Sequence, residues 1–176
     1  MKKSKALYIL FVLIGLLAGF SILFIPAIST SPEQPPGLLY YTFLHFAGYL
    51  FFVVSFIEIL SVYMIRVGSN PYLIILLSVV SAVAALCVDY WIGRVMSTPV
   101  MINLIGEKRY NRLRHRLVKY RDPALFVFNL LPLSSPLLTA VAGILRYDFS
   151  RVILVSFLGL FFKYVILASA LLFVFS

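Results

Sequence analysis

Residues 129–146 read NLLPLSSPLLTAVAGILR, an apolar segment that prolines and serines interrupt. Pro132 and Pro136 lack a backbone N–H, so this segment predicts two short helices rather than one continuous helix. Ser135 followed by Pro136 is typical of an N-cap and first turn, which indicates that a new helix starts there. A helix that starts inside a membrane presents its positive end and its unpaired N–H groups to an anion. Many transporters build a binding site near the bilayer midplane in this way.

The composition indicates the class of protein. The chain has 176 residues and is 62% hydrophobic, whereas about 45–50% is usual for a soluble domain. Apolar runs longer than about 18 residues recur, so we expect an all-α polytopic membrane protein with a single membrane domain. The single cysteine, Cys87, excludes an intramolecular disulfide. Catalytic and cofactor motifs are missing, so we expect neither an enzyme nor a metal or cofactor site.

The net charge of +9 arises mostly in one loop. For a membrane chain this favours a cytoplasmic face against anionic lipid over nucleic-acid binding. We therefore expect a multi-pass protein of the plasma membrane whose partners are membrane lipids. Whether it forms a homo-oligomer stays open.

The apolar runs and the links between them divide the chain into six segments. We expect, in order, a transmembrane helix at 6–28, a re-entrant hairpin or transmembrane helix at 38–71, a transmembrane helix at 72–96, a basic cytoplasmic amphipathic segment at 97–122, a re-entrant hairpin at 123–146 and a transmembrane helix at 152–175. A signal peptide is the alternative for the first run, although that run exceeds the usual apolar core of about 7–15 residues.

The distribution of basic residues predicts the topology. The basic N-terminus and segment 97–122 should both face the cytoplasm, which requires an even number of crossings between them. This condition holds if 38–71 enters and leaves on the outer face. Basic residues also flank 123–146, so this segment should return to its own side, and the two opposed hairpins then form an inverted repeat. The alternative is an outside N-terminus with ordinary spans.

Glu58 lies deep in an apolar run, FIEIL. An ionisable group inside a membrane is costly and indicates a functional site, here proton carriage or counter-charge. The alternative is that Glu58 lies near an interface and pairs with Arg66. His45 is alone in an apolar helix, so core packing or a hydrogen bond is favoured over a metal site.

Asp89 is a second acidic candidate. It shares one face of the predicted helix with residues that are small or polar and recur every three or four positions: Ser78, Ala82, Ala85 and Gly93. Such a face lets another backbone come close. Asp89 is therefore either part of a functional site or a residue of a helix-packing interface. Arg94 is an i,i+4 neighbour of Tyr90 on an adjacent face.

The broken segment supplies the remaining candidates. Asn129, Ser134, Ser135 and Thr139 can hydrogen-bond a phosphate, or can satisfy the backbone carbonyls that the prolines free. Arg146 ends the second half-helix and is either a phosphate partner or a plain membrane anchor.

Three ordered blocks resemble one family. FIE with Glu58, DYWIGR at 89–94, and the stretch from Asn129 to Phe149 resemble the DedA family, also called the VTT or SNARE-associated Golgi protein family, and its small YqaA-like branch in particular. The first and third blocks resemble the family's two re-entrant hairpins. The resemblance runs from Phe56 onward and covers about two-thirds of the chain.

The resemblance implies a membrane transporter that flips or scrambles phospholipids or polyprenyl-phosphate lipid carriers, with proton coupling proposed for some members. The chain departs from the family where Asn129 and Ser135 replace arginines, and where Lys163 replaces a tryptophan. We therefore expect weak, permissive headgroup binding, because the chain lacks the two arginines and arginine has the geometry best suited to bidentate phosphate binding. The alternatives are a structural or assembly protein and a proton-coupled exporter of small solutes.

Overall fold

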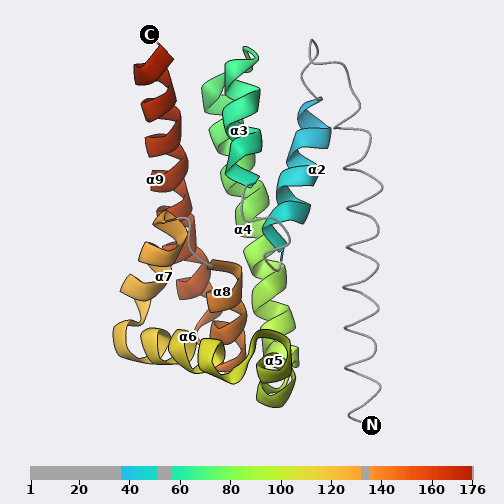
Figure 1. The fold of residues 1–176 in the computed structure, drawn as a ribbon, viewed down its shortest axis with the longest axis vertical. Coiled ribbons are helices and arrows are strands. Elements are labelled where there is room, and N and C mark those ends of the chain that lie inside the picture. Colours follow the sequence, from blue (N-terminus) through green and yellow to red (C-terminus); the bar gives the residue numbers. More distant parts are fainter. Residues whose placement is uncertain (1–36, 51–56, 132–134, 176) are drawn as a thin grey trace.

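The computed structural model describes residues 37–50, 57–131 and 135–175 (Figure 1). All regular elements in these ranges are helices, which confirms the predicted all-α class: α2 Leu38–Tyr49, α3 Ile57–Arg66, α4 Pro71–Val95, α5 Thr98–Ile105, α6 Glu107–Tyr120, α7 Asp122–Leu130, α8 Ser135–Ile144 and α9 Phe149–Phe175. The predicted helix at 6–28 and the candidate Ser134 lie outside the described residues.

Two long helices form the axis of the described bundle. Pro71–Val95 and Phe149–Leu171, with 25 and 23 residues, are long and apolar enough to cross a membrane. Helix α4 begins where the Asn70 side chain accepts a hydrogen bond from the Tyr72 backbone N–H at 3.0 Å. Helix α9 begins earlier than the predicted residue 152, because Asp148 accepts a hydrogen bond from the Arg151 N–H at 2.8 Å and so caps its first turn.

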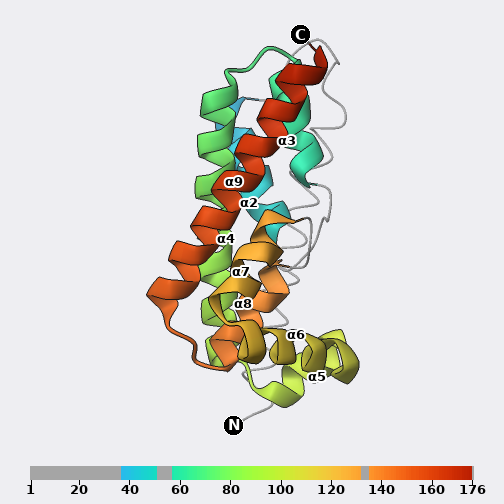
Figure 2. The same cartoon turned by 90° about the vertical axis from the view of Figure 1, so that its left-hand side faces the viewer.

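Two pairs of short helices enter the bundle from opposite ends (Figures 1 and 2). We call the end that carries α5 and α6 the basic end, and the end where α9 finishes the distal end. Helix α2 runs inward from the distal end and α3 returns to it, whereas α7 runs inward from the basic end and α8 returns. Helix α2 packs on α4, and α7 packs on α9. Helix α7 ends at Leu130 and α8 begins at Ser135, so two short helices form here instead of one continuous helix, as the prolines predict.

The basic segment folds across one end of the bundle. Helix α6 lies across the axis of the long helices (Figure 1), packs on α8 and buries Tyr110, Leu113 and Leu117 on one face. The spacing of Leu104, Leu113 and Leu117 predicts that all three share one helix face, but Leu104 does not join it and is 51% exposed. The reason is the turn at Gly106, whose φ of 84° ends α5 and redirects the chain before α6 begins.

Glycines bring α4 and α8 into backbone contact. A Cβ added to Gly93 would lie 2.8 Å from the Ala140 Cα, and one added to Gly143 would lie 2.9 Å from the Arg94 backbone nitrogen. Either atom would overlap its neighbour, so no larger side chain fits at Gly93 or Gly143 unless the helices move. The Gly93 end of the small-residue face of α4 is therefore the surface on which α8 packs, whereas Ser78, at the other end of this face, contacts Tyr41 and Ser61.

Candidate functional site

A buried ion pair lies at the inner end of α3. The Lys163 ammonium donates a hydrogen bond to a Glu58 carboxylate oxygen, and the two side chains are only 9% and 18% exposed. Lys163 lies 14 residues after the start of α9, or roughly 21 Å along a helix that rises 1.5 Å per residue. Glu58 thus pairs with α9 and not with Arg66, which lies at the opposite end of α3. Each charge compensates the other in a region where a lone charge is costly.

Aromatic and hydroxyl groups surround this ion pair. The Lys163 Nζ lies 5.7 Å from the centre of the Tyr49 ring and 5.9 Å from that of Tyr164, distances at which a cation is attracted to the ring face. The Tyr49 hydroxyl lies 3.5 Å from the Ser135 Oγ. We call Tyr49, Glu58, Ser135 and Lys163 the central polar cluster.

The central polar cluster is the place where the inner ends of both short-helix pairs meet. Tyr49 ends α2, Glu58 lies in the first turn of α3 and Ser135 begins α8. Lys163 comes from the middle of the long helix α9. Four helices from both ends of the bundle therefore contribute to one charged and hydroxylated centre.

Hydrogen bonds continue from this centre toward the distal end. His45 is fully buried, with its Nε2 2.7 Å from the Tyr164 hydroxyl and its Nδ1 2.8 Å from the Ser81 Oγ. The Ser81 Oγ lies 2.6 Å from the Leu77 carbonyl oxygen, to which it donates its one proton, so the geometry favours an Nδ1–H donor on His45 and an Nε2 that accepts from Tyr164. This bears out the prediction that His45 makes core hydrogen bonds.

Asp89 lies in the seam between α4 and α8. It is fully buried on the face of α4 that also carries Gly93. Gly93 contacts Ala140, and α4 and α8 run in the same direction. Asp89 lies one turn before Gly93, so it is closer than Gly93 to the start of α8.

Asn129 ties α7 to α9. Its amide nitrogen donates to the Leu125 carbonyl at 2.8 Å and to the Ser156 Oγ at 3.1 Å. Its Oδ1, like the Oγ1 of Thr139 on α8, is buried and makes no hydrogen bond with the described residues. Both side chains therefore retain acceptor capacity on either side of the break between α7 and α8.

Arg94 belongs to a contact network at the basic end. It is exposed and donates to the Tyr90 hydroxyl at 3.1 Å, and Tyr90 in turn donates to the Tyr147 carbonyl at 2.5 Å. The Tyr147 hydroxyl donates to Asp122 at 2.5 Å. Burial, with this hydrogen bond, raises the pKa of the Tyr147 phenol. These contacts join α4 and α7 to the link between α8 and α9.

Arg146 is separated from Ser135 by the whole length of α8. Eleven residues of helix correspond to roughly 16 Å. Arg146 is exposed in the turn that ends α8, with a φ of 55°, and the hydrogen bonds from its N–H to Gly143 and from Tyr147 to Ala142 form a Schellman cap. Arg146 therefore lies at the basic end, away from Ser135, and its role as a phosphate partner or a membrane anchor stays a prediction.

Sequence reasoning missed the role of Lys163. The family resemblance gives Lys163 only as a replacement for a tryptophan, although it is the one lysine of an apolar run at 152–175. The rule that singles out Glu58 applies equally to Lys163, and two opposite charges in apolar runs predict a pair. Among the described residues, no group of three histidine, cysteine or acidic side chains could hold a metal ion.

The comparisons with known proteins agree with this architecture. The family model described as the VTT domain matches residues 40–172, which is more than half of the chain. No curated protein and no solved structure matches. The resemblance to the DedA family is thus confirmed. The protein belongs to the VTT-domain family, the DedA/SNARE-associated group of membrane proteins.

Proposed function

We propose that this VTT-domain protein moves phosphate-bearing lipids, such as phospholipids or polyprenyl-phosphate carriers, across the plasma membrane. The observation that carries the proposal is the Glu58–Lys163 ion pair, which lies where the inner ends of the two short-helix pairs meet. A membrane protein has no need of a charged, hydroxylated centre for packing alone, because apolar side chains of similar volume pack as well or better. Such a centre suits the headgroup of a lipid that crosses the bilayer.

The lengths of the short helices support re-entrant hairpins. Helices α2 and α3 have 12 and 10 residues, and α7 and α8 have 9 and 10. At 1.5 Å per residue they reach roughly 14–18 Å, about half of the 30 Å hydrocarbon core. Each pair would therefore enter from one face, stop near the midplane and return, while α4 and α9 cross the membrane.

The basic end would face the cytoplasm. Helix α6 exposes its arginines and lysines on the side away from α8, and basic segments remain on the cytoplasmic side. The hairpin of α7 and α8 would then open to the cytoplasm and that of α2 and α3 to the opposite side. The central polar cluster, where the two hairpins would meet, would then be a polar site halfway along the path that a lipid headgroup takes across the membrane.

The chemistry at this site is a competition for one cation. Lys163 binds either the Glu58 carboxylate or a lipid phosphate. A phosphate that reaches this centre would displace the carboxylate from the ammonium, and re-formation of the ion pair would release the headgroup. Lys163 is a compact point charge with no bidentate geometry, so headgroup binding would be weak and permissive. The lipid tails would stay in the bilayer.

A structural or assembly role is the second candidate. The observation that favours it is the glycine-mediated backbone contact between α4 and α8, which leaves no room for a headgroup along that seam. Under this alternative, the central polar cluster would serve only to fix the arrangement of the hairpins.

Reconstituted liposomes separate the two candidates. Purified protein is placed in vesicles that contain a fluorescent phosphatidylglycerol, and a membrane-impermeant reductant reports how fast the label leaves the inner leaflet. We expect movement faster than in protein-free vesicles, and a large loss of this movement in Glu58→Gln and Lys163→Met variants. Glu107→Gln, which removes an exposed carboxylate at the start of α6, is the matched control and should move lipid like the wild type. Movement no faster than in protein-free vesicles would support the structural role.

A further inference from the structure

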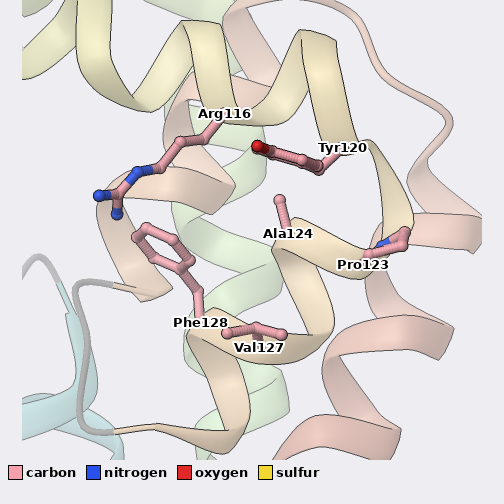
Figure 3. A pocket seen from close by; sticks show the side chains of 6 residues that line it. All are labelled: Arg116, Tyr120, Pro123, Ala124, Val127 and Phe128. Atoms are coloured by element: carbon pink, nitrogen blue, oxygen red, sulfur yellow. The ribbon is translucent and has the colours of Figure 1, made fainter.

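An apolar pocket lies in the corner where α6 meets α7 (Figure 3). Its volume is about 290 Å³, and its lining side chains are Arg116, Tyr120, Pro123, Ala124, Val127 and Phe128. This volume is at the lower limit of the roughly 300–1,000 Å³ that small-molecule sites enclose. The pocket therefore accommodates part of an amphiphile, such as one acyl chain, rather than a whole lipid.

Two cations lie over the aromatic rings of this pocket. The Arg116 guanidinium lies next to the Phe128 ring (Figure 3), with its carbon 5.3 Å from the ring centre. The Lys119 Nζ is 5.0 Å from the centre of the Tyr120 ring. The pocket thus combines an apolar interior with a positively charged rim, which is complementary to a ligand with an apolar tail and an anionic head.

The position of the pocket matches the way a lipid lies in a leaflet. Helix α6 lies across the basic end, and α7 runs from there toward the middle of the bundle (Figure 2). The apolar side chains of Val127 on α7 and of Leu131, directly after α7, are 42% and 46% exposed. A ligand whose head lies at α6 can therefore extend its tail along α7 into the hydrocarbon region.

We propose that this pocket binds one acyl chain of an anionic glycerophospholipid from the leaflet on the α6 side, with the lipid phosphate between Arg116 and Lys119. The rim charges favour an anionic over a zwitterionic headgroup, since each basic residue near an anionic lipid surface adds to binding. The pocket is separate from the central polar cluster and is formed by α6 and α7 alone. Binding there is independent of whether the protein transports lipid.

Photochemical labelling tests the site directly. Full-length protein is reconstituted in phosphatidylcholine vesicles that contain a phosphatidylglycerol with a photoactivatable group in one acyl chain, and labelled peptides are mapped by mass spectrometry. We expect the label to concentrate on α7 around Val127. Unlabelled phosphatidylglycerol should compete with it, and additional phosphatidylcholine should not.

Matched variants separate the pocket from general surface charge. Arg116→Gln should weaken the competition by phosphatidylglycerol about fivefold, the effect of one basic residue at an anionic surface. Arg114→Gln removes an equal charge from an exposed position two residues away, on the far side of α6, and should have little effect. Val127→Trp, which fills the mouth of the pocket, should abolish labelling of α7, whereas Val127→Ala should preserve it.

Three results would overturn the proposal. The label could be spread evenly over the apolar helices, Arg114→Gln could weaken binding as much as Arg116→Gln, or phosphatidylcholine could compete as well as phosphatidylglycerol. Because the readout is labelling and not lipid movement, its outcome is distinct from that of the transport assay.

Discussion

A double-mutant cycle on the Glu58–Lys163 ion pair should reveal strong coupling. Lys163→Met removes the ammonium and leaves a carboxylate that is only 18% exposed without its cation; Glu58→Gln leaves an ammonium that is 9% exposed. Loss of one partner of a buried pair costs about 3–5 kcal/mol, and the residual exposure of Glu58 puts our expectation near about 3 kcal/mol for each single variant. The double variant has no buried charge and should lose only about 1 kcal/mol.

The assay is unfolding of purified protein in mixed micelles, followed by circular dichroism, with wild type, both single variants and the double variant measured in parallel. Strong coupling means that the double variant is more stable than either single variant. If the two losses add to within about 0.5 kcal/mol, the side chains act independently, and the reasoning about the ion pair is refuted.

The same double variant separates folding from transport. If the charges serve only to hold α3 against α9, a stable double variant should behave like the wild type in every functional assay. If they serve the headgroup path, the double variant should be folded and inactive, since no cation remains at the centre to bind a phosphate. This comparison needs no assumption about which lipid is the natural substrate.

Three further predictions concern the scaffold. Gly93→Ala should force α4 and α8 apart and lower the free energy of unfolding by about 1–3 kcal/mol, whereas Gly37→Ala, where a Cβ meets nothing within 4 Å, should be nearly neutral in the same micelle titration. Tyr147→Phe removes the hydrogen bond to the carboxylate at the start of α7 and should cost about 1 kcal/mol; an unchanged unfolding midpoint would show that this bond is negligible. Single cysteines at Arg121 and Asp148 should react with a membrane-impermeant maleimide from the same side of the membrane, and labelling from opposite sides would mean that the segment between them crosses.

The features of the fold that can be predicted from the sequence are those that depend on residues close together in the chain. The break between α7 and α8 follows from Pro132 and Pro136, because a missing N–H acts at its own position whatever the rest of the chain does. The buried face of α6 likewise follows from the spacing of Leu113 and Leu117. Composition alone predicted a helical membrane protein, and the family match agrees.

The partners within the site could not be predicted in the same way. Glu58 and Lys163 are 105 positions apart in sequence, so their contact depends on how α3 and α9 pack. The hydrophobic periodicity of a helix does not indicate which other helix it packs against. The distance between Arg146 and Ser135 could be predicted from the sequence, because a helix of known length fixes the distance between its ends. The glycine contact between α4 and α8 lies between these cases: the small-residue face was visible in the sequence, but its partner helix was not.

The role of Lys163 in lipid movement is tested most directly by two fluorescent lipids with identical tails in the same proteoliposomes, one a phosphatidylglycerol and the other a neutral glycolipid without phosphate. We expect the wild-type protein to move the phosphate lipid faster than protein-free vesicles do and faster than the glycolipid, and we expect Lys163→Met to abolish this preference. Equal rates for the two lipids, or a phosphate preference that survives in Lys163→Met, would contradict the claim that a lipid phosphate crosses the membrane by way of Lys163.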